Sequence, residues 1–279
     1  MRPNQRPSDN NDSQGPAFLV MDTESVPDGR LLAMVKYSED HLTPEEAVIR
    51  AQQEARDKSP NNSDFLPVSF QYPVSVCILR VGADYGIQAM TCLDAPFYRP
   101  RKIVEAFWNG LAMYKEKFKK PVKLVTFNGR GFDLPLLELA AFRYGCSGRD
   151  YFQSSRNRFG GGHMDLMELL SNFNACRITG GLNLLSKLLG KPGKIDVAGD
   201  QVYQMFLEGR LQDINDYCMF DTLDTYFVFL RTRVMVGEMT LADEHRHVIN
   251  ARDWIQDQTK KVPALDRYLD NWVEWKPWP

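Results

Sequence analysis

A short apolar run that ends in two carboxylates constrains this chain more than any other feature. Residues 18–21 are Phe-Leu-Val-Met, and Asp22 and Glu24 follow with one residue between them. Four consecutive apolar residues predict a strand buried on both faces. Because side chains alternate along a strand, Asp22 and Glu24 project to the same side, where two ionised carboxylates repel unless a cation lies between them. A divalent metal ion is the obvious cation, and a strand end facing water is the alternative.

Length and composition bound the kind of protein. The 279 residues, 43% of them hydrophobic, suffice for one sizeable globular domain with an appendage, or two small domains. A formal net charge of −2 gives no global attraction for polyanions, so nucleic acid would have to bind through local patches or metal. Five scattered cysteines favour reduced thiols and a cytoplasmic location. Without a signal-type segment or a long apolar window, we expect neither secretion nor membrane contact.

The first strand is followed by a long detour over residues 28–64. Within it, Thr43-Pro44-Glu45-Glu46 is a capping box with proline at the first helical position, which predicts a polar helix to about Lys58. We interpret the detour as an insertion at the rim of the sheet. A plain surface helix is the preferred interpretation, and a lid near the site is the alternative.

Two β-type runs and a helix follow the insertion. Residues 74–81 and 87–93 flank a glycine-rich turn and predict a hairpin. An amphipathic helix with apolar residues from Ile103 to Tyr114 precedes a strand over 122–127. Strand, helix and strand in this order predict a mixed α/β sheet.

A third carboxylate lies at the end of the strand over 122–127. That strand runs into Asn128-Gly129-Arg130-Gly131-Phe132-Asp133, after which an apolar helix continues to Gly145. Asp133 falls in the first helical turn, where a negative side chain favours the helix dipole. Capping alone explains Asp133, but a shared metal site would also need a carboxylate at such a junction.

A fourth carboxylate lies in the helical second half of the chain. Residues 146–163 are interpreted as a loop rich in Arg, Gly and aromatics that either grips a phosphate backbone or is an ordinary surface loop, with His163 structural and Asp165 an N-cap. Helices are expected over 181–189, 199–209 and 213–236. In the last of these, Tyr217 and Asp221 are four residues apart and share a face, which indicates that this face meets a polar site.

Both ends of the chain have a distinct composition. Residues 1–16 have the composition of a disordered tail. Residues 236–279 are expected to form a helical extension packed on the domain. This extension ends with three tryptophans within seven residues, Trp272 to Trp278. Packing of these rings back onto the domain is the default, and docking to a protein partner is the alternative.

Four acids therefore need a common explanation: Asp22, Glu24, Asp133 and Asp221. If they converge in a partly buried site, a compensating cation is required, because each uncompensated buried charge costs several kcal/mol. Ligands that are all oxygen favour Mg²⁺ or Mn²⁺ over zinc. Two such ions would activate a water and stabilise the leaving oxygen of a phosphoryl displacement.

The order of three motifs carries a resemblance to a known family. Asp22-x-Glu24, Asn128-x-x-x-Phe132-Asp133 and Tyr217-x-x-x-Asp221 resemble the three motifs of the DEDD 3′-5′ exonucleases, in the branch with Tyr in the third motif. The chain is most similar to stand-alone bacterial proteins that resemble the exonuclease domain of family B DNA polymerases. The resemblance covers about residues 17–235 and implies an RNase H-like mixed five-stranded sheet flanked by helices.

The resemblance also implies a role for each motif residue. Asp22, Glu24 and Asp221 would hold the metal on the side of the nucleophile, with Asp22 bridging to a second ion that Asp133 supports. Tyr217 would orient the attacking water. The residues expected to face the substrate strand are Thr23, Asn128, Arg130 and Phe132.

The sequence therefore predicts a 3′-5′ exonuclease that uses two divalent ions, Mg²⁺ or Mn²⁺, on single-stranded nucleic acid with a free 3′ end. DNA is the favoured substrate. Two alternatives stay open: an exoribonuclease with the same chemistry, and a nucleic-acid-binding module of the same fold without turnover.

Overall fold

The computed structural model describes residues 15–120, 122–195 and 199–277, which include a mixed five-stranded sheet of order β3-β2-β1-β4-β5. β1 pairs antiparallel with β2 and parallel with β4, β2 pairs antiparallel with β3, and β4 pairs parallel with β5. This mixed five-stranded sheet flanked by helices confirms the predicted α/β fold class. The strands are β1 (Phe18–Pro27), β2 (Gln71–Val81), β3 (Ile87–Cys92), β4 (Lys123–Thr126) and β5 (His163–Asp165).

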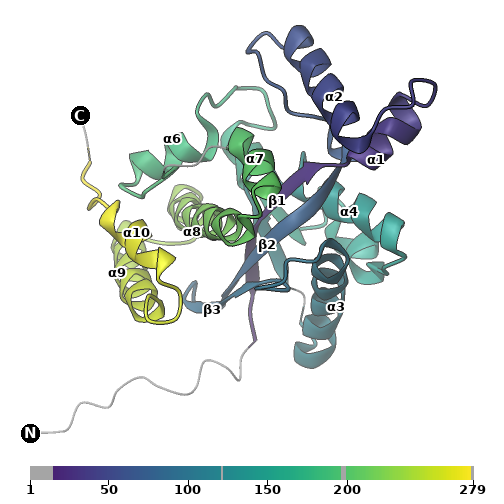
Figure 1. Ribbon diagram of the computed structural model, residues 1–279. Helices are drawn as coiled ribbons and strands as arrows, with labels where there is room; N and C mark the ends of the chain where they lie inside the picture. Colours follow the sequence, from purple (N-terminus) through teal and green to yellow (C-terminus); the bar gives the residue numbers. More distant parts are fainter. Residues whose placement is uncertain (1–14, 121, 196–198, 278–279) are drawn as a thin grey trace, which may run out of the picture.

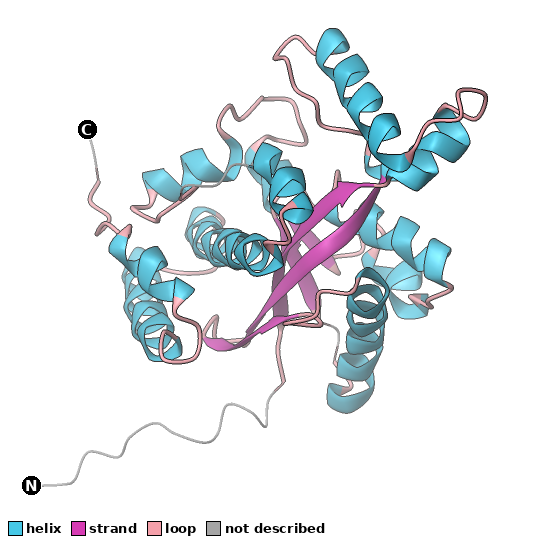
Figure 2. Ribbon diagram, in the orientation of Figure 1, coloured by secondary structure: helices cyan, strands magenta, loops and turns pink. Residues whose placement is uncertain are grey.

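Helices cover both faces of the sheet (Figures 1 and 2). α3 (Pro100–Phe118) and α4 (Asp133–Tyr144) pack on one face, and α8 (Leu211–Met235) packs on the other, against β1 and β2. α8 is surrounded in turn by its neighbours, which explains why it is buried around most of its circumference. The remaining α-helices are α1 (Gly29–Leu31), α2 (Pro44–Lys58), α5 (Leu166–Leu170), α6 (Gly181–Leu188), α7 (Val202–Leu207), α9 (Leu241–Gln258) and α10 (Ala264–Asp270).

Alternation along β1 divides its side chains between two cores. Leu19 and Met21 belong to the core formed with α3 and α4, whereas Val20 belongs to the core formed with α8. Asp22 and Glu24 continue the series of Val20 and therefore face α8, while Thr23 continues the series of Met21. The register of one strand thus determines which helix each site residue meets.

The insertion has a small core of its own. Residues from the segment after β1, from α2 and from the segment before β2 are buried together, including Leu32, Val48 and Leu66. The predicted capping box of α2 is present, with the Thr43 side chain accepting a hydrogen bond from the backbone N–H of Glu46. In Figure 1 this unit lies at one end of the sheet.

The C-terminal extension packs on α8. Leu265 and Tyr268 are fully buried in the same core as Val20, and the Tyr268 hydroxyl donates a 2.6 Å hydrogen bond to Asp224. The Trp272 ring meets the Phe227 ring at 4.9 Å between centroids. Trp278 and the N-terminal tail through residue 14 lie outside the described residues.

The structure differs from the sequence prediction in two segments, residues 146–163 and residues 199–209. The predicted loop over 146–163 contains a π-helical turn, Tyr151–Ser155, and its last residue opens β5; the expected helix over 199–209 begins as a 3₁₀ turn, Gly199–Gln201. Strand β5 has only three residues, too few for a periodic signal.

All five cysteines are free thiols. Among the described helices, none combines the length and the apolar character that crossing a membrane requires.

Candidate active site

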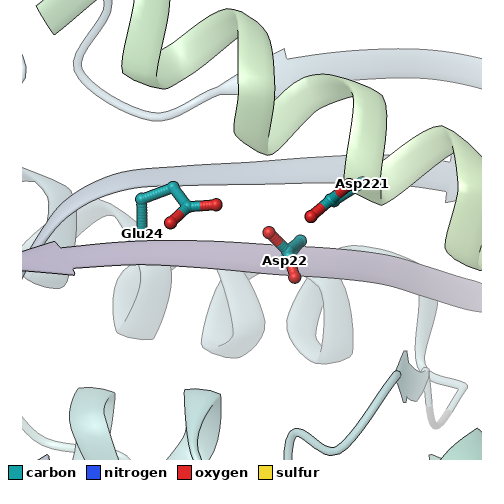
Figure 3. A group of neighbouring side chains, drawn as sticks. All are labelled: Asp22, Glu24 and Asp221. Atoms are coloured by element: carbon teal, nitrogen blue, oxygen red, sulfur yellow. The ribbon is translucent and has the colours of Figure 1, made fainter. Parts of the chain in front are cut away.

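Three acids from two distant motifs converge between β1 and α8. Asp22, Glu24 and Asp221 each present a carboxylate oxygen within 4.8 Å of the other two. Figure 3 shows the first two side chains rising from the strand and the third reaching down from the helix. About two hundred residues separate the motifs along the chain, so packing of α8 on the sheet creates this group. We call Asp22, Glu24 and Asp221 the carboxylate cluster.

The carboxylate cluster pays an electrostatic penalty when ionised. Burial raises the pKa values of Asp22 and Glu24 well above their ordinary range, and neighbouring acids raise them further. Burial likewise raises the pKa of Asp221 to about 7, with Asp224 adding to the shift, while Lys194 acts in the opposite direction on Glu24 and Asp221. A hard divalent cation bound by these oxygens would remove the repulsion. The donor set therefore fits such an ion.

Asp133 lies beside the carboxylate cluster and is not one of its members. It is 97% buried at the start of α4, and its carboxylate accepts a 2.7 Å hydrogen bond from the Thr23 hydroxyl. Thr23 faces α4 because it alternates with Asp22 and Glu24 along β1. Burial raises the pKa of Asp133 to about 7, even though the Thr23 hydrogen bond lowers it. Asp133 and Asp22 still interact electrostatically.

Tyr217 lies one helical turn before Asp221 and is 94% buried. Burial raises the pKa of Tyr217 far above its ordinary value, and the charges of Asp221, Glu24 and Asp22 raise it further. A hydrogen bond with Tyr217 lowers the pKa of Asp221. The phenol therefore keeps its proton at neutral pH and can donate it in a hydrogen bond.

The Asn-Gly-Arg-Gly turn after β4 is organised by Asp165, a residue that sequence reasoning identified only as a helix cap. Its side chain does cap α5, but it also accepts hydrogen bonds from the backbone N–H groups of Asn128 at 3.0 Å and Arg130 at 2.9 Å. Asn128 has a φ of 63°, in the left-handed region that Asn tolerates better than most residues. The pairing of β4 with β5 brings Asp165 under this turn, and no local sequence signal reveals that.

The residues expected to contact substrate differ in their exposure and in their contacts within the protein. Asn128 is exposed, and Phe132 is half-buried against another aromatic ring. The Arg130 guanidinium is bound to Glu168 at 3.1 Å, so its side chain is engaged within the protein. Two arginines of the loop over 146–163 are also paired, Arg156 with Glu138 and Arg158 with Glu168. A phosphate would have to compete with these acids.

Comparison with known proteins bears on this geometry. A family model described as a predicted 3′-5′ exonuclease related to the exonuclease domain of PolB matches residues 63–272. The chain belongs to this family. The match includes Asp133, Tyr217 and Asp221, and it begins after Asp22 and Glu24. The family model does not cover Asp22 and Glu24. The structure places these two acids next to Asp221, which the family model does cover.

Other comparisons add little. The fold is similar to that of the family B DNA polymerase from the hyperthermophilic archaeon Pyrobaculum calidifontis, with 14% sequence identity and a TM-score of 0.46. The aligned region covers 78% of this chain and 24% of the polymerase, so the chain spans about a quarter of that protein. No curated protein matches the chain.

Proposed function

We propose that this protein is a metal-dependent 3′-5′ exonuclease that hydrolyses phosphodiester bonds at the 3′ end of single-stranded nucleic acid, with DNA favoured over RNA. The observation that carries the proposal is the carboxylate cluster, in which oxygens of Asp22, Glu24 and Asp221 lie within 4.8 Å of one another. Membership in the exonuclease family supports the same chemistry.

The carboxylate cluster would hold divalent ions, Mg²⁺ or Mn²⁺. Asp22, Glu24 and Asp221 supply only oxygen ligands, which suit hard cations, and Asp133 lies close enough to interact with Asp22. When bound, two such ions supply activation of the attacking water and stabilisation of the leaving oxygen.

The chain's own residues would then position the reactants. Tyr217 retains its proton and offers a hydrogen bond next to Asp221, which suits it to orient a water rather than to act as the base. The Thr23 hydroxyl fixes the orientation of the Asp133 carboxylate. Asn128, Arg130 and Phe132, which follow β4, and Thr23 of β1 remain the proposed contacts to the substrate strand.

A labelled oligonucleotide tests the proposal. Purified protein with Mn²⁺ or Mg²⁺ should shorten a single strand labelled at its 5′ end one nucleotide at a time, and chelation of the metal should stop the reaction. A strand of the same sequence made of RNA measures the preference for the sugar. Release of internal fragments, or turnover that persists in excess chelator, would contradict the proposal. Metal-dependent binding without any shortening would instead identify a nucleic-acid-binding module.

A further inference from the structure

We propose that Phe65, which lies between the insertion over 28–64 and β2, stacks on the 3′-terminal base of the substrate strand and forms one wall of the site together with Phe132. This inference rests on the proposed exonuclease function. It assigns a role in substrate binding to the segment that connects the insertion to β2.

The two rings lie together beside one acidic motif. The Phe65 and Phe132 ring centroids are 5.5 Å apart with an angle of 54° between the ring planes. Phe132 is the N-cap residue of α4, and Asp133 follows it directly. Phe65 is 56% exposed, so much of its ring is free to contact another molecule.

Phe65 also adjoins the second acidic motif. A cavity of about 30 Å³ is lined by residues that include Phe65, Gln71 and Ser25, and Ser25 follows Glu24 in β1. The ring therefore lies between the chain segments that carry Asp133 and Glu24. A cavity of this size cannot enclose a base, so a base at this position would lie across the exposed ring.

The backbone on both sides of Phe65 is fixed. Before it, Asp64 forms a 2.8 Å ion pair with Arg56 of α2. After it, Leu66 is 96% buried in the core of the insertion, and its carbonyl accepts a 2.6 Å hydrogen bond from the Gln71 side chain. An exposed aromatic ring on an anchored segment loses little conformational entropy when a ligand covers it.

The chemistry of the ring fits an exonuclease substrate. Stacking of a base on an aromatic side chain contributes about 1–3 kcal/mol and tolerates all bases, because every base has a π face. An enzyme that removes successive nucleotides needs this tolerance. A base can lie on Phe65 only when it is unpaired and unstacked from its neighbour, which also favours single-stranded ends.

The test compares two substrates on one preparation of each variant. One oligonucleotide ends in a normal 3′ nucleotide, and the other ends in a 3′ nucleotide that lacks its base. Wild type should have a kcat/KM about tenfold higher on the normal strand, from one stacked base. In Phe65→Ala this ratio should fall to near one, with most of the change in KM, and Phe65→Trp should retain the ratio.

A second exposed aromatic ring, on α4, provides the control. Phe142→Ala removes a ring that is 90% exposed at the other end of α4 and should leave the ratio unchanged. Because both substrates are compared on the same preparation, a fraction of unfolded protein cancels. A ratio that stays at the wild-type value in Phe65→Ala overturns the stacking role while the exonuclease function stands. A wild type that degrades neither strand overturns the proposed function and this inference with it.

Discussion

Asp165 and the half-buried acids of the carboxylate cluster differ in what surrounds them. Asp165 is 95% buried and accepts hydrogen bonds from the backbone N–H groups of four residues: Asn128, Arg130, Met167 and Glu168. The carboxylate cluster instead presents acids to one another, with burial and mutual repulsion raising their pKa values.

The difference suits Asp165 to a structural role and the carboxylate cluster to the proposed binding of metal. Backbone N–H groups stabilise the charge of Asp165 within the protein, and in return Asp165 fixes the turn between β4 and α4. The carboxylate cluster has little internal compensation, and under the proposed function a bound cation would supply it. Replacing Asp165 and replacing a member of the carboxylate cluster should therefore affect different properties.

The largest effect is expected for Asp221→Asn. Loss of one charged ligand should reduce exonuclease activity about 10³-fold, since metal ions supply several kcal/mol of transition-state stabilisation. Because the substitution also removes repulsion, the metal-free protein should be as stable as wild type or more stable. Initial rates on the labelled oligonucleotide and thermal unfolding in chelator measure the two properties. Lower stability together with lost activity would place Asp221 among the structural acids.

Asp165→Ala should show the opposite pattern. Backbone groups left without their charged acceptor should cost about 2–3 kcal/mol in the free energy of unfolding. Activity per folded molecule should fall much less than in Asp221→Asn, because Asp165 only supports the turn that leads to Asp133. Urea denaturation and rates corrected for the folded fraction test this expectation. An unchanged free energy of unfolding would show that the turn does not depend on Asp165.

The pH dependence of the metal-free protein should reveal the raised pKa values of Asp221, a member of the carboxylate cluster, and of its neighbour Asp133. Asp133 and Asp221 have pKa values raised to about 7, above their unfolded values near roughly 4. Their raised pKa values stabilise the fold while they are protonated, and that contribution is lost as pH rises through about 7. Without metal, the free energy of unfolding should decrease by about 1–2 kcal/mol between pH 6.5 and pH 8. Mg²⁺ should restore it, and Asp221→Asn should flatten the profile.

The smallest effect is expected from His163, two residues before Asp165 in β5. Its contribution to the free energy of unfolding changes with pH in the opposite direction. Burial lowers the pKa of His163 to about 3, and its Nε2 lies 2.8 Å from the Thr126 hydroxyl. The neutral ring is favoured in the fold, so stability is lost as pH falls below the unfolded pKa of about 6.5. His163 should contribute about 1 kcal/mol of this loss between pH 6.5 and 5.5. In His163→Gln that part of the profile should be flatter, and an identical profile would contradict the assignment.

Much of the fold follows from local sequence signals. The buried run before Asp22, the hairpin, the capping box of α2 and the apolar helix after Asp133 all occur as predicted. β5 could not be predicted, because three residues have no measurable period and gain their strand geometry from pairing with β4. Long-range pairing in a short strand is a property of the fold rather than of the segment.

Some features of the site followed from local sequence signals, and others depend on tertiary contacts. Alternation in β1 predicted that Asp22 and Glu24 share a side, and helical spacing placed Tyr217 and Asp221 on one face. Sequence spacing could not show that Asp133 lies outside the carboxylate cluster and accepts a hydrogen bond from Thr23. Nor could it show Asp165 beneath the turn or Phe65 against Phe132, since these contacts join segments that only the tertiary structure brings together.

Calorimetric titration of the metal-free protein with Mn²⁺ tests the central claim most directly. Wild type should show saturable binding, Asp22→Asn should lose it, and Asp213→Asn, which changes an acid of α8 that pairs with Arg210, should retain it. Absence of saturable binding in wild type, or equal binding in wild type and Asp22→Asn, would contradict a metal centre at the carboxylate cluster.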